Sequence, residues 1–341
     1  MRFPAFIQPG DTIGFVAPSF GCATEPYRTA FSNALKKFEN LGYHTKLGPN
    51  CYSDCGIGIS NTPEKCAAEW MTMYRDSGTD CLISCGGGEL MCEVLSHMDF
   101  SELAGARPKW FMGYSDNTNL TFLLTTLADT ASLYAPCAAS FGMEPWHPAI
   151  TDAFDLLQGK KREISNYPLW EKESKKDEEH PLEPYHVTEP FCLKAFPDEE
   201  ETVFQGRLVG GCLDCLSQLA GTRYDRVVEF AKKYEKDGII WFLEACDLNV
   251  MDIRRTLWKL REAGWFRHVR GFLIGRPAHF DEPMMGLNQY EAVTGVLAEL
   301  NVPILMDLDI GHLAPMMPLV CGASATVQRT GKDVQIRMEM K

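Results

Sequence analysis

Short apolar runs alternate with longer segments of helical periodicity through the first half of the chain. The apolar runs predict strands at 12–18, 44–47, 81–84 and 109–114. Apolar residues at helical spacing predict helices at 27–41, 63–75 and 117–127. Because strands that alternate with helices are joined by crossover connections, this half of the chain predicts a mostly parallel sheet.

The stretch from 164 to 201 interrupts this alternation. It holds the charged run 172–179, followed by prolines at 181, 184, 190 and 197, with little periodicity, which is typical of a long surface excursion or linker. Beyond it, the pattern predicts strands at 203–209, 238–243, 272–275 and 302–306, helices at 211–220 and 252–263, and a hairpin at 325–337. We therefore expect two α/β domains, 1–163 and 202–341, with a linker at 164–201.

Charge and composition narrow the class of protein. The 341 residues carry 33 Lys+Arg against 46 Asp+Glu, a formal charge of −13. A chain this acidic repels phosphate backbones and anionic lipid, so we expect neither a nucleic-acid polymer nor a membrane as partner. Hydrophobic residues at 45% can fill one or two cores without metal or disulfide support.

The amino-terminal residues and the cysteines favour the cytoplasm. Two prolines and an aspartate interrupt residues 1–11, and no segment approaches 18 consecutive apolar residues. We therefore expect neither a signal peptide nor a membrane span. Thirteen cysteines, in a chain without an export signal, are typical of reduced thiols in a cytosolic compartment.

The run Gly113-Tyr114-Ser115-Asp116-Asn117 carries the first candidate for chemistry. An apolar strand ends there and a helical pattern starts directly afterwards. A serine at such a turn exposes its hydroxyl, with backbone N–H groups behind it for an oxyanion. Asn117 stands where a G-x-S-x-G motif has its second glycine. The alternative is that Ser115 or Asp116 only caps the helix, and spacing alone favours that alternative.

A glycine-rich turn, Gly86-Gly87-Gly88, follows another predicted strand. Three glycines allow a ligand to approach the backbone and its N–H donors closely. Neither a dinucleotide fingerprint nor a Walker lysine accompanies them, so the specific phosphate motifs are absent. A tight turn without a ligand is the alternative interpretation.

Glu244 and His312 are the other candidates. Glu244 directly follows a buried strand, where α/β folds place their ligands, and His312 lies in a loop bounded by Gly311 and Pro315. A helix-starting acid and a surface histidine are the simpler explanations for each. Together with Ser115 they supply the nucleophile, base and orienting carboxylate of a hydrolytic relay.

Cys212 and Cys215 form a C-x-x-C motif. A zinc site needs a second close pair of this kind, which the sequence lacks. The two cysteines also fall within a helical apolar pattern, so we interpret them as small buried side chains rather than as a metal or redox site.

With these residues in view, the chain resembles the serine peptidase family of LD-carboxypeptidases and microcin C immunity proteins, nearer the immunity branch. The similar segments run in order over nearly the whole length: 9–19, 84–88, 113–118, 206–213, 242–244 and 311–319. Within them, the run from Gly113 to Thr118 matches the nucleophile motif of the family.

The resemblance implies a catalytic role for each candidate. Ser115 would be the nucleophile, His312 the general base and Glu244 its orienting carboxylate. Backbone N–H groups near Gly87 and at Asp116 would form the oxyanion hole, with Gly86 and Gly88 beside the substrate.

The family fold implies an amino-terminal Rossmann-like domain that carries the serine. A smaller carboxyl-terminal α/β domain of swivelling type would carry the glutamate and histidine, with the active site at the interface. Relatives of this kind are cytoplasmic homodimers without a metal or other cofactor, and we expect the same here.

Two departures from the family pattern bear on the substrate. Cys212 stands where relatives often carry an asparagine, and the 164–201 excursion is longer than murein-type carboxypeptidases usually have. In the immunity branch an aromatic residue of this substrate loop stacks on a nucleotide base. Trp170 is the candidate, with Tyr167 and Tyr185 behind it, and Trp170 covering its own loop is the alternative. Arg276 is the candidate for binding a terminal carboxylate.

The sequence leaves two classes of function open. One is a serine carboxypeptidase-type hydrolase, acting either on a peptidyl or aminoacyl nucleotide such as processed microcin C, or on an L,D-linked murein tetrapeptide in cell-wall recycling. The other is a non-catalytic protein that binds small peptides or nucleotides.

Overall fold

The computed structural model describes residues 1–340, which divide into two compact units. Unit 1 comprises Met1–Lys161 and Glu173–His186, and unit 2 comprises Arg162–Lys172 and the chain from Val187 onward. Each unit has its own sheet and its own core.

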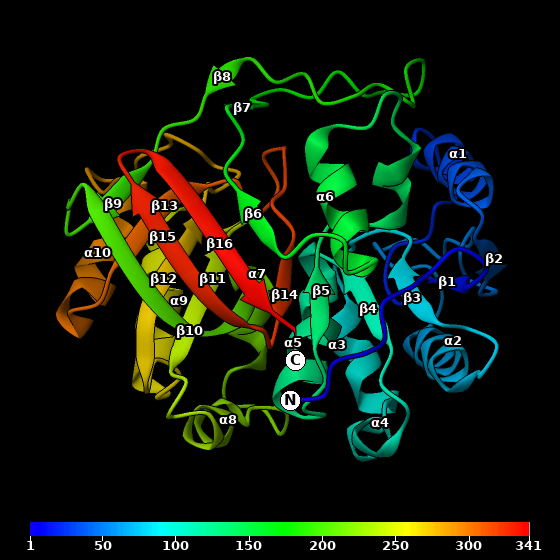
Figure 1. The fold of residues 1–341 in the computed structure, drawn as a ribbon, viewed down its shortest axis with the longest axis horizontal. Coiled ribbons are helices and arrows are strands. Elements are labelled where there is room, and N and C mark those ends of the chain that lie inside the picture. The colour runs from blue at the N-terminus through cyan, green and yellow to red at the C-terminus, as the bar shows by residue number, and fades with distance from the viewer. Residues whose placement is uncertain (341) are drawn as a thin grey trace. The chain divides into compact units, whose positions relative to one another are not determined.

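The sheet of unit 1 is parallel throughout. Its strands lie in the order β5-β4-β3-β1-β2, as Figure 1 shows, and every neighbouring pair is parallel. Their bounds are β1 Thr12–Val16, β2 His44–Leu47, β3 Cys81–Ser84, β4 Trp110–Gly113 and β5 Ser132–Tyr134. Because parallel strands end at the same edge, the turns after β3 and β4 lie close together.

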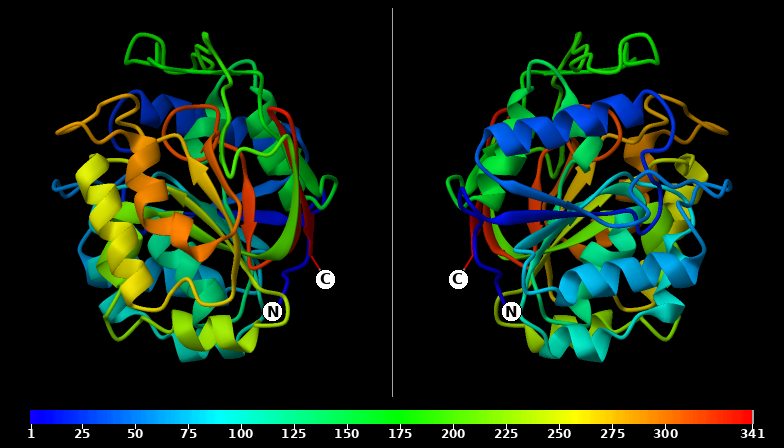
Figure 2. Two further views of the ribbon diagram at one scale, coloured as in Figure 1. Left: turned by 90° about the vertical axis from the view of Figure 1, so that its left-hand side faces the viewer. Right: turned by 90° about the vertical axis from the view of Figure 1, so that its right-hand side faces the viewer.

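Helices cover both faces of this sheet. In the right-hand view of Figure 2, α1 (Tyr27–Asn40) and α2 (Pro63–Arg75) lie on opposite sides of the strands. The buried stripe of α1 includes Phe31 and Phe38, whose rings lie 5.4 and 5.7 Å from that of Phe15 in β1. The helical spacing of these apolar residues is thus what attaches α1 to the sheet.

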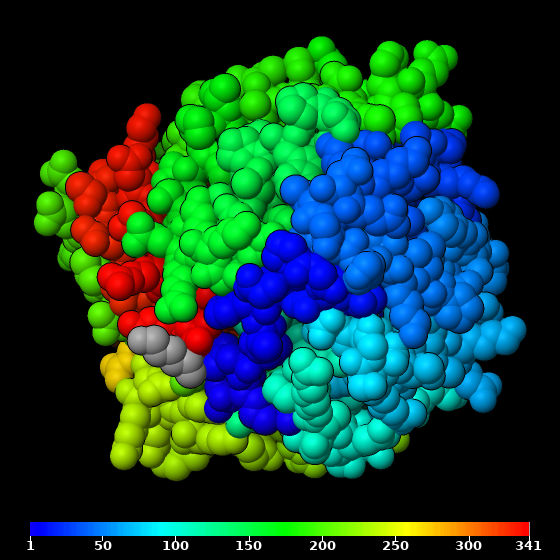
Figure 3. All heavy atoms as spheres, turned by 45° about the vertical axis from the view of Figure 1, so that its right-hand side comes forward, coloured from blue at the N-terminus to red at the C-terminus, as the bar shows by residue number. Residues whose placement is uncertain are grey.

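The remaining helical segments of unit 1 are shorter. They are α3 Met91–Val94, η1 Leu95–His97, α4 Phe100–Gly105, η2 Ser115–Asn117, α5 Thr118–Thr126, η3 Ala138–Gly142 and α6 Pro148–Leu157. The amino-terminal segment runs over the surface beside α4 (Figure 3), where the Arg2 guanidinium donates to the carbonyls of Leu103 and Ala106.

Unit 2 has a mixed sheet of eight strands in the order β6-β16-β15-β10-β11-β12-β13-β9 (Figure 1). The central strands β10 to β13 are parallel, and antiparallel strands complete both edges. The bounds are β6 Glu163–Ser165, β9 Lys194–Phe196, β10 Glu201–Cys212, β11 Ile239–Glu244, β12 Val269–Gly275, β13 Ile304–Leu308, β15 Ser324–Thr330 and β16 Asp333–Glu339. A separate pair consists of β7 Leu169–Trp170 and β8 Glu189–Pro190, and β14 spans Leu319–Cys321.

The helical segments of unit 2 are α7 Leu213–Leu219, α8 Val227–Lys233, α9 Val250–Glu262, α10 Gln289–Leu297 and η4 Ala298–Leu300. In the left-hand view of Figure 2, α9 (yellow) and α10 (orange) lie side by side. Trp241 of β11 is buried and stacks on Trp265, with ring centroids 5.8 Å apart. The strand that carries Glu244 is therefore held at the centre of the sheet by core packing.

The structure confirms the predicted α/β class and parallel strands. The 164–201 stretch is divided rather than continuous: β6 and β9 join opposite edges of the unit 2 sheet, whereas residues 173–186 belong to unit 1. Among the helices described, none combines the length and the apolar character needed to cross a bilayer.

Candidate active site

Ser115 lies at a sharp turn between β4 and α5. Its φ is +63°, a left-handed conformation that is costly for a residue with a side chain. The 3₁₀ turn Ser115–Asn117 then leads into α5. A serine held in this conformation between a strand and a helix has the geometry of a nucleophile elbow.

Asn117 explains why this turn departs from the G-x-S-x-G pattern. Its side-chain amide donates to the carbonyl oxygens of Gly86, at 2.8 Å, and of Tyr114, at 3.0 Å. A Cβ at Gly113 would lie 2.7 Å from Asn117 Cγ, so the glycine leaves room for the amide. Asn117 thus ties the serine turn to the glycine-rich turn.

The glycine-rich turn lies directly against the serine. A Cβ at Gly87 would lie 3.1 Å from both Cβ and Oγ of Ser115. Gly86 is packed against Phe20, and Gly88, with φ +123°, is packed against Ser19. Backbone at Gly87 can therefore approach a group bonded to Ser115 more closely than any residue with a side chain would allow.

The Asp116 carboxylate joins the serine turn to the segment after β1 and to the start of α3. It is buried, and its Oδ2 accepts hydrogen bonds from Ser19 Oγ at 2.6 Å and from the Met91 backbone N–H at 2.8 Å. Asn119 donates to Oδ1 at 2.9 Å. The sequence offered two roles for Asp116, its backbone N–H in an oxyanion hole or a helix cap, and no local pattern pointed to this use of its carboxylate.

In unit 2, Glu244 and His312 form a dyad. His312 Nδ1 lies 2.9 Å from Glu244 Oε2, and the Glu244 side chain is fully buried. Burial alone would lower the pKa of His312, but the negative charge and hydrogen bond of Glu244, with a hydrogen bond to Cys246, raise that pKa well above its ordinary value. This pairing is the base-and-orienter geometry of a hydrolytic relay.

Gly311 allows the histidine loop to approach Glu244. It has φ +116°, and a Cβ there would lie 2.8 Å from Glu244 Oε2. No other residue fits this position without displacing the carboxylate.

The Cys246 thiol contacts the dyad. It forms a hydrogen bond with His312, and the backbone N–H of Cys246 donates to Asp214 Oδ2 at 3.1 Å. Asp214 Oδ1 also accepts from the Asp247 N–H at 2.9 Å. Asp214, in the first turn of α7, therefore holds the loop that follows Glu244. Neither Cys246 nor Asp214 was a candidate from the sequence, because nothing in the local pattern links α7 to this loop.

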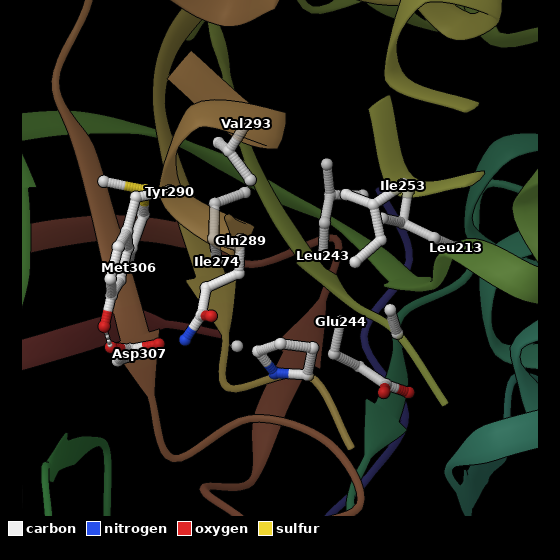
Figure 4. A pocket seen from close by; sticks show the side chains of 13 residues that line it. Leu213, Leu243, Glu244, Ile253, Ile274, Gln289, Tyr290, Val293, Met306 and Asp307 are labelled. Carbon is white, nitrogen blue, oxygen red and sulfur yellow. Dashed lines mark hydrogen bonds between the residues drawn. The ribbon is translucent and has the colours of Figure 1, made fainter. Parts of the chain in front are cut away.

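An apolar wall lies behind Glu244. Figure 4 shows Leu213, Leu243 and Ile253 on one side of a pocket, with the Glu244 carboxylate directed away from them. At the far end, the Tyr290 hydroxyl donates to Asp307 Oδ2 at 2.5 Å (Figure 4). The apolar lining excludes water from one side of Glu244, which strengthens its interaction with His312.

Arg276 is buried, with 1% of its surface exposed. Its Nη2 donates to the Asp307 carbonyl and to Asp309 Oδ1, both at 3.1 Å, whereas its Nη1 has no hydrogen-bond partner within residues 1–340. Burial raises the pKa of Asp309 to about 6, against the opposing effect of the Arg276 charge.

The three candidate aromatic residues of the substrate loop lie in different surroundings. Trp170 is 5% exposed, with its ring 4.3 Å from the Arg276 guanidinium carbon and 5.1 Å from the Phe280 ring. Tyr167 is buried in the same unit, whereas Tyr185 lies against His147 in unit 1. Trp170 and Arg276 are therefore direct neighbours, although they lie more than one hundred positions apart in the sequence.

No group of three or more His, Cys, Asp or Glu side chains among residues 1–340 is arranged to hold a metal ion. The reactive groups described above are a hydroxyl at a left-handed turn and a histidine–carboxylate pair.

These features define a class, the two-unit α/β hydrolases that use a serine nucleophile. Models of the LD-carboxypeptidase amino-terminal and carboxyl-terminal domains match residues 13–135 and 205–327. The chain belongs to this family, peptidase family S66, and is a serine carboxypeptidase-type hydrolase.

Relatives match over nearly the full length. The chain is 26% identical to the Escherichia coli microcin C7 self-immunity protein MccF, covering 96% of this chain and 93% of that protein. It is also 26% identical to a Bacillus subtilis protein named "Probable murein peptide carboxypeptidase", covering 98% and 93%. A solved structure of MccF in complex with aspartyl sulfamoyl adenosine has the same fold, with TM-score 0.84 and 22% identity over 100% of this chain and 99% of that one.

Proposed function

We propose that Ser115, His312 and Glu244 act as one catalytic triad that hydrolyses an amide or acyl bond of a peptidyl or aminoacyl nucleotide. The observation that carries the proposal is the His312–Glu244 pair, at 2.9 Å on a buried carboxylate. The left-handed turn at Ser115 supports the same assignment, because it presents a hydroxyl beside the glycine-rich turn.

The mechanism follows from these roles. His312 takes the Ser115 hydroxyl proton as Oγ attacks the scissile carbonyl, and Glu244 holds the imidazole and offsets its charge. Backbone N–H groups at Gly87 and Asp116 stabilise the oxyanion, each worth about 2.7–4 kcal/mol of barrier. His312 then protonates the leaving amine. In the second half of the reaction, His312 takes a proton from a water molecule, which attacks the acyl-enzyme and releases Ser115.

The nucleotide part of the proposal rests on Trp170 and on the relatives. A MccF structure is described with aspartyl sulfamoyl adenosine, and a second with glutamyl sulfamoyl guanosine. An aromatic–base stack is worth about 1–3 kcal/mol by alanine substitution. Since Arg276 lies over the Trp170 ring and Phe280 packs against it, a base would stack there only after one of these side chains moves.

Arg276 is the proposed donor to a substrate carboxylate or its mimic. Its Nη1 is buried and finds no hydrogen-bond partner in the described part of the chain, whereas Nη2 donates to Asp309 and to the Asp307 carbonyl. A carboxylate that reached Nη1 would satisfy this donor, which is costly to leave unpaired.

A murein peptide is the second candidate substrate, because the Bacillus subtilis relative named for that activity matches at the same identity as MccF. For this substrate Trp170 would have no base to bind.

Two measurements test the proposal. A fluorophosphonate should label Ser115 in the wild-type protein and not in Ser115→Ala. Aspartyl sulfamoyl adenosine and an L,D-linked tetrapeptide are then compared as substrates with wild type, Trp170→Ala and the control Trp258→Ala, whose side chain is 54% exposed on α9. We expect Trp170→Ala to lower kcat/KM for the nucleotide about 5- to 150-fold, the equivalent of 1–3 kcal/mol, and Trp258→Ala to change it little.

Absence of labelling in a folded sample would favour a non-catalytic binding protein. Cleavage of the tetrapeptide alone would assign the murein reaction instead. Nucleotide cleavage that is unchanged in Trp170→Ala would refute the stacking role.

We further infer a cytoplasmic homodimer. The thirteen cysteines, none of which is disulfide-bonded, suit a reducing compartment. Sedimentation equilibrium at micromolar protein would measure the assembly, and a monomer would refute the dimer.

A further inference from the structure

Cys212 and Cys215 stand apart from the other cysteines of unit 2 because their thiols contact each other. A hydrogen bond joins the two side chains. Cys212 is the last residue of β10 and Cys215 lies in the first turn of α7, so the strand-to-helix turn brings the C-x-x-C pair together. Cys212 is buried, whereas Cys215 is partly exposed. Cys215 is therefore the more accessible residue of the pair.

The same pair is connected to the dyad within unit 2. Cys212 pairs with Glu244 in the β10–β11 register. The Cys212 thiol also donates to Asp214 Oδ2 at 3.2 Å, the oxygen that accepts from the Cys246 N–H. The Cys246 thiol in turn contacts His312. A change at Cys212 therefore reaches His312 through two residues, Asp214 and Cys246.

We propose that Cys212 and Cys215 form an oxidisable dithiol, a modification site that closes a disulfide beside the catalytic dyad. This differs from our interpretation of the sequence, in which both were small buried side chains. Thiols already in hydrogen-bond contact across a C-x-x-C turn need little backbone movement to reach disulfide geometry.

The oxidant is a small disulfide such as oxidised glutathione. The accessible Cys215 thiolate attacks one glutathione sulfur, which breaks the glutathione S–S bond and releases one glutathione thiolate. Cys212 then loses its proton, for which Asp214 Oδ2 is the nearest acceptor, and attacks Cys215 Sγ. The second glutathione leaves, so one oxidised glutathione is converted to two reduced ones for each protein disulfide.

Closing the disulfide removes the thiol proton that Cys212 donates to Asp214. Asp214 then loses one of its three contacts, and the loop that carries Cys246 loses part of its support. We expect hydrolysis to fall about 100-fold in the oxidised protein, as a small misplacement of a catalytic group does. This effect on activity rests on the proposed function, whereas the disulfide itself does not.

The test uses the full-length protein in glutathione buffers of increasing oxidation. Samples are quenched with N-ethylmaleimide, digested and mapped by mass spectrometry. In oxidised wild type, the peptide with Cys212 and Cys215 should carry no maleimide and be two mass units lighter than the unlabelled dithiol peptide. After treatment with dithiothreitol, both cysteines should again react with N-ethylmaleimide. The exposed Cys55, Cys92 and Cys192 report on the oxidation of ordinary surface thiols in the same samples. Cys215→Ser should lose the response, and the matched variant Cys192→Ser should keep it.

Two outcomes would overturn the dithiol: both cysteines still carry maleimide when the exposed cysteines carry glutathione, or Cys212 pairs with a different cysteine. Hydrolysis of aspartyl sulfamoyl adenosine is followed in the same samples. A disulfide that leaves the rate unchanged would refute the link to His312. A protein with no hydrolysis under any condition would refute the proposed function, and the mass of the peptide would still decide the disulfide.

Discussion

Replacing Gly311 by alanine tests how far the His312–Glu244 pair depends on a close backbone approach. The added Cβ would lie 2.8 Å from Glu244 Oε2 and 2.9 Å from Glu244 Cβ. Gly311 also has φ +116°, a backbone conformation that an alanine adopts only under strain. Gly221 of the same unit provides the matched control, because it has φ +83° and nothing within 4 Å of its added Cβ.

The magnitudes of the two effects can be separated. Backbone strain should cost each variant about 1–3 kcal/mol of unfolding free energy. Ordinary contact at a Cβ begins near 3.4 Å, so in Gly311→Ala the carboxylate must move by several tenths of an ångström. Since His312 Nδ1 lies only 2.9 Å from Oε2, such a movement breaks the hydrogen bond. We expect kcat/KM to fall about 100-fold in Gly311→Ala alone.

The assay pairs urea unfolding with hydrolysis of aspartyl sulfamoyl adenosine, measured well below the unfolding midpoint. Both variants should lose stability, and only Gly311→Ala should lose activity. If Gly221→Ala loses as much activity as Gly311→Ala, backbone strain and not the carboxylate contact explains the effect. If Gly311→Ala keeps wild-type kcat/KM, the dyad is not the base of this enzyme.

Three further variants test other parts of the site. Glu244→Gln removes the charge that raises the pKa of His312 and leaves the burial that lowers it, so the acidic limb of kcat/KM should move to lower pH while the maximum falls about 10⁴-fold; an unshifted limb contradicts the pairing. Asp116→Asn replaces one carboxylate oxygen by an NH2 group, so either Ser19 and Met91 lose their shared acceptor or Asn119 loses its own; unfolding free energy should fall about 1–3 kcal/mol and kcat should fall more than KM changes, whereas a pure stability loss would limit Asp116 to a structural role. Gly113→Ala forces Asn117 aside and should lower kcat at unchanged secondary structure by circular dichroism; full activity would show that Asn117 is not needed to hold the turn.

The elements with strong periodicity were predictable from the sequence. The predicted helix 63–75 and strand 81–84 coincide with α2 and β3, and the helix 27–41 extends one residue beyond α1. These segments bury one apolar face or a whole strand, so local spacing reports their environment. The short edge strands β6 and β9 were not predicted, because the sheet edge that pairs them lies far away in sequence.

The site was predictable only in part for a related reason. Ser115 lies just after a strand, Glu244 ends one and His312 follows a glycine, and a local pattern reveals each of these positions. The side chains that hold them, such as Asp116, Asp214 and Cys246, make contacts with residues 25 to 97 positions away in the sequence. Such contacts leave no periodic trace, so a single sequence cannot distinguish these residues from ordinary capping or surface groups.

Two of the candidate catalytic side chains lie against a glycine. Gly87 lies against Ser115, and Gly311 lies against Glu244; in both places an added Cβ would meet the functional side chain within about 3 Å. Backbone this close can direct an N–H group toward the substrate, as at Gly87, or place the next residue's imidazole beside Glu244, as at Gly311. A side chain at either glycine would displace Ser115 or Glu244. Gly87 and Gly311 are therefore needed for the positions of Ser115 and Glu244. A search of the sequence for reactive side chains alone does not find them.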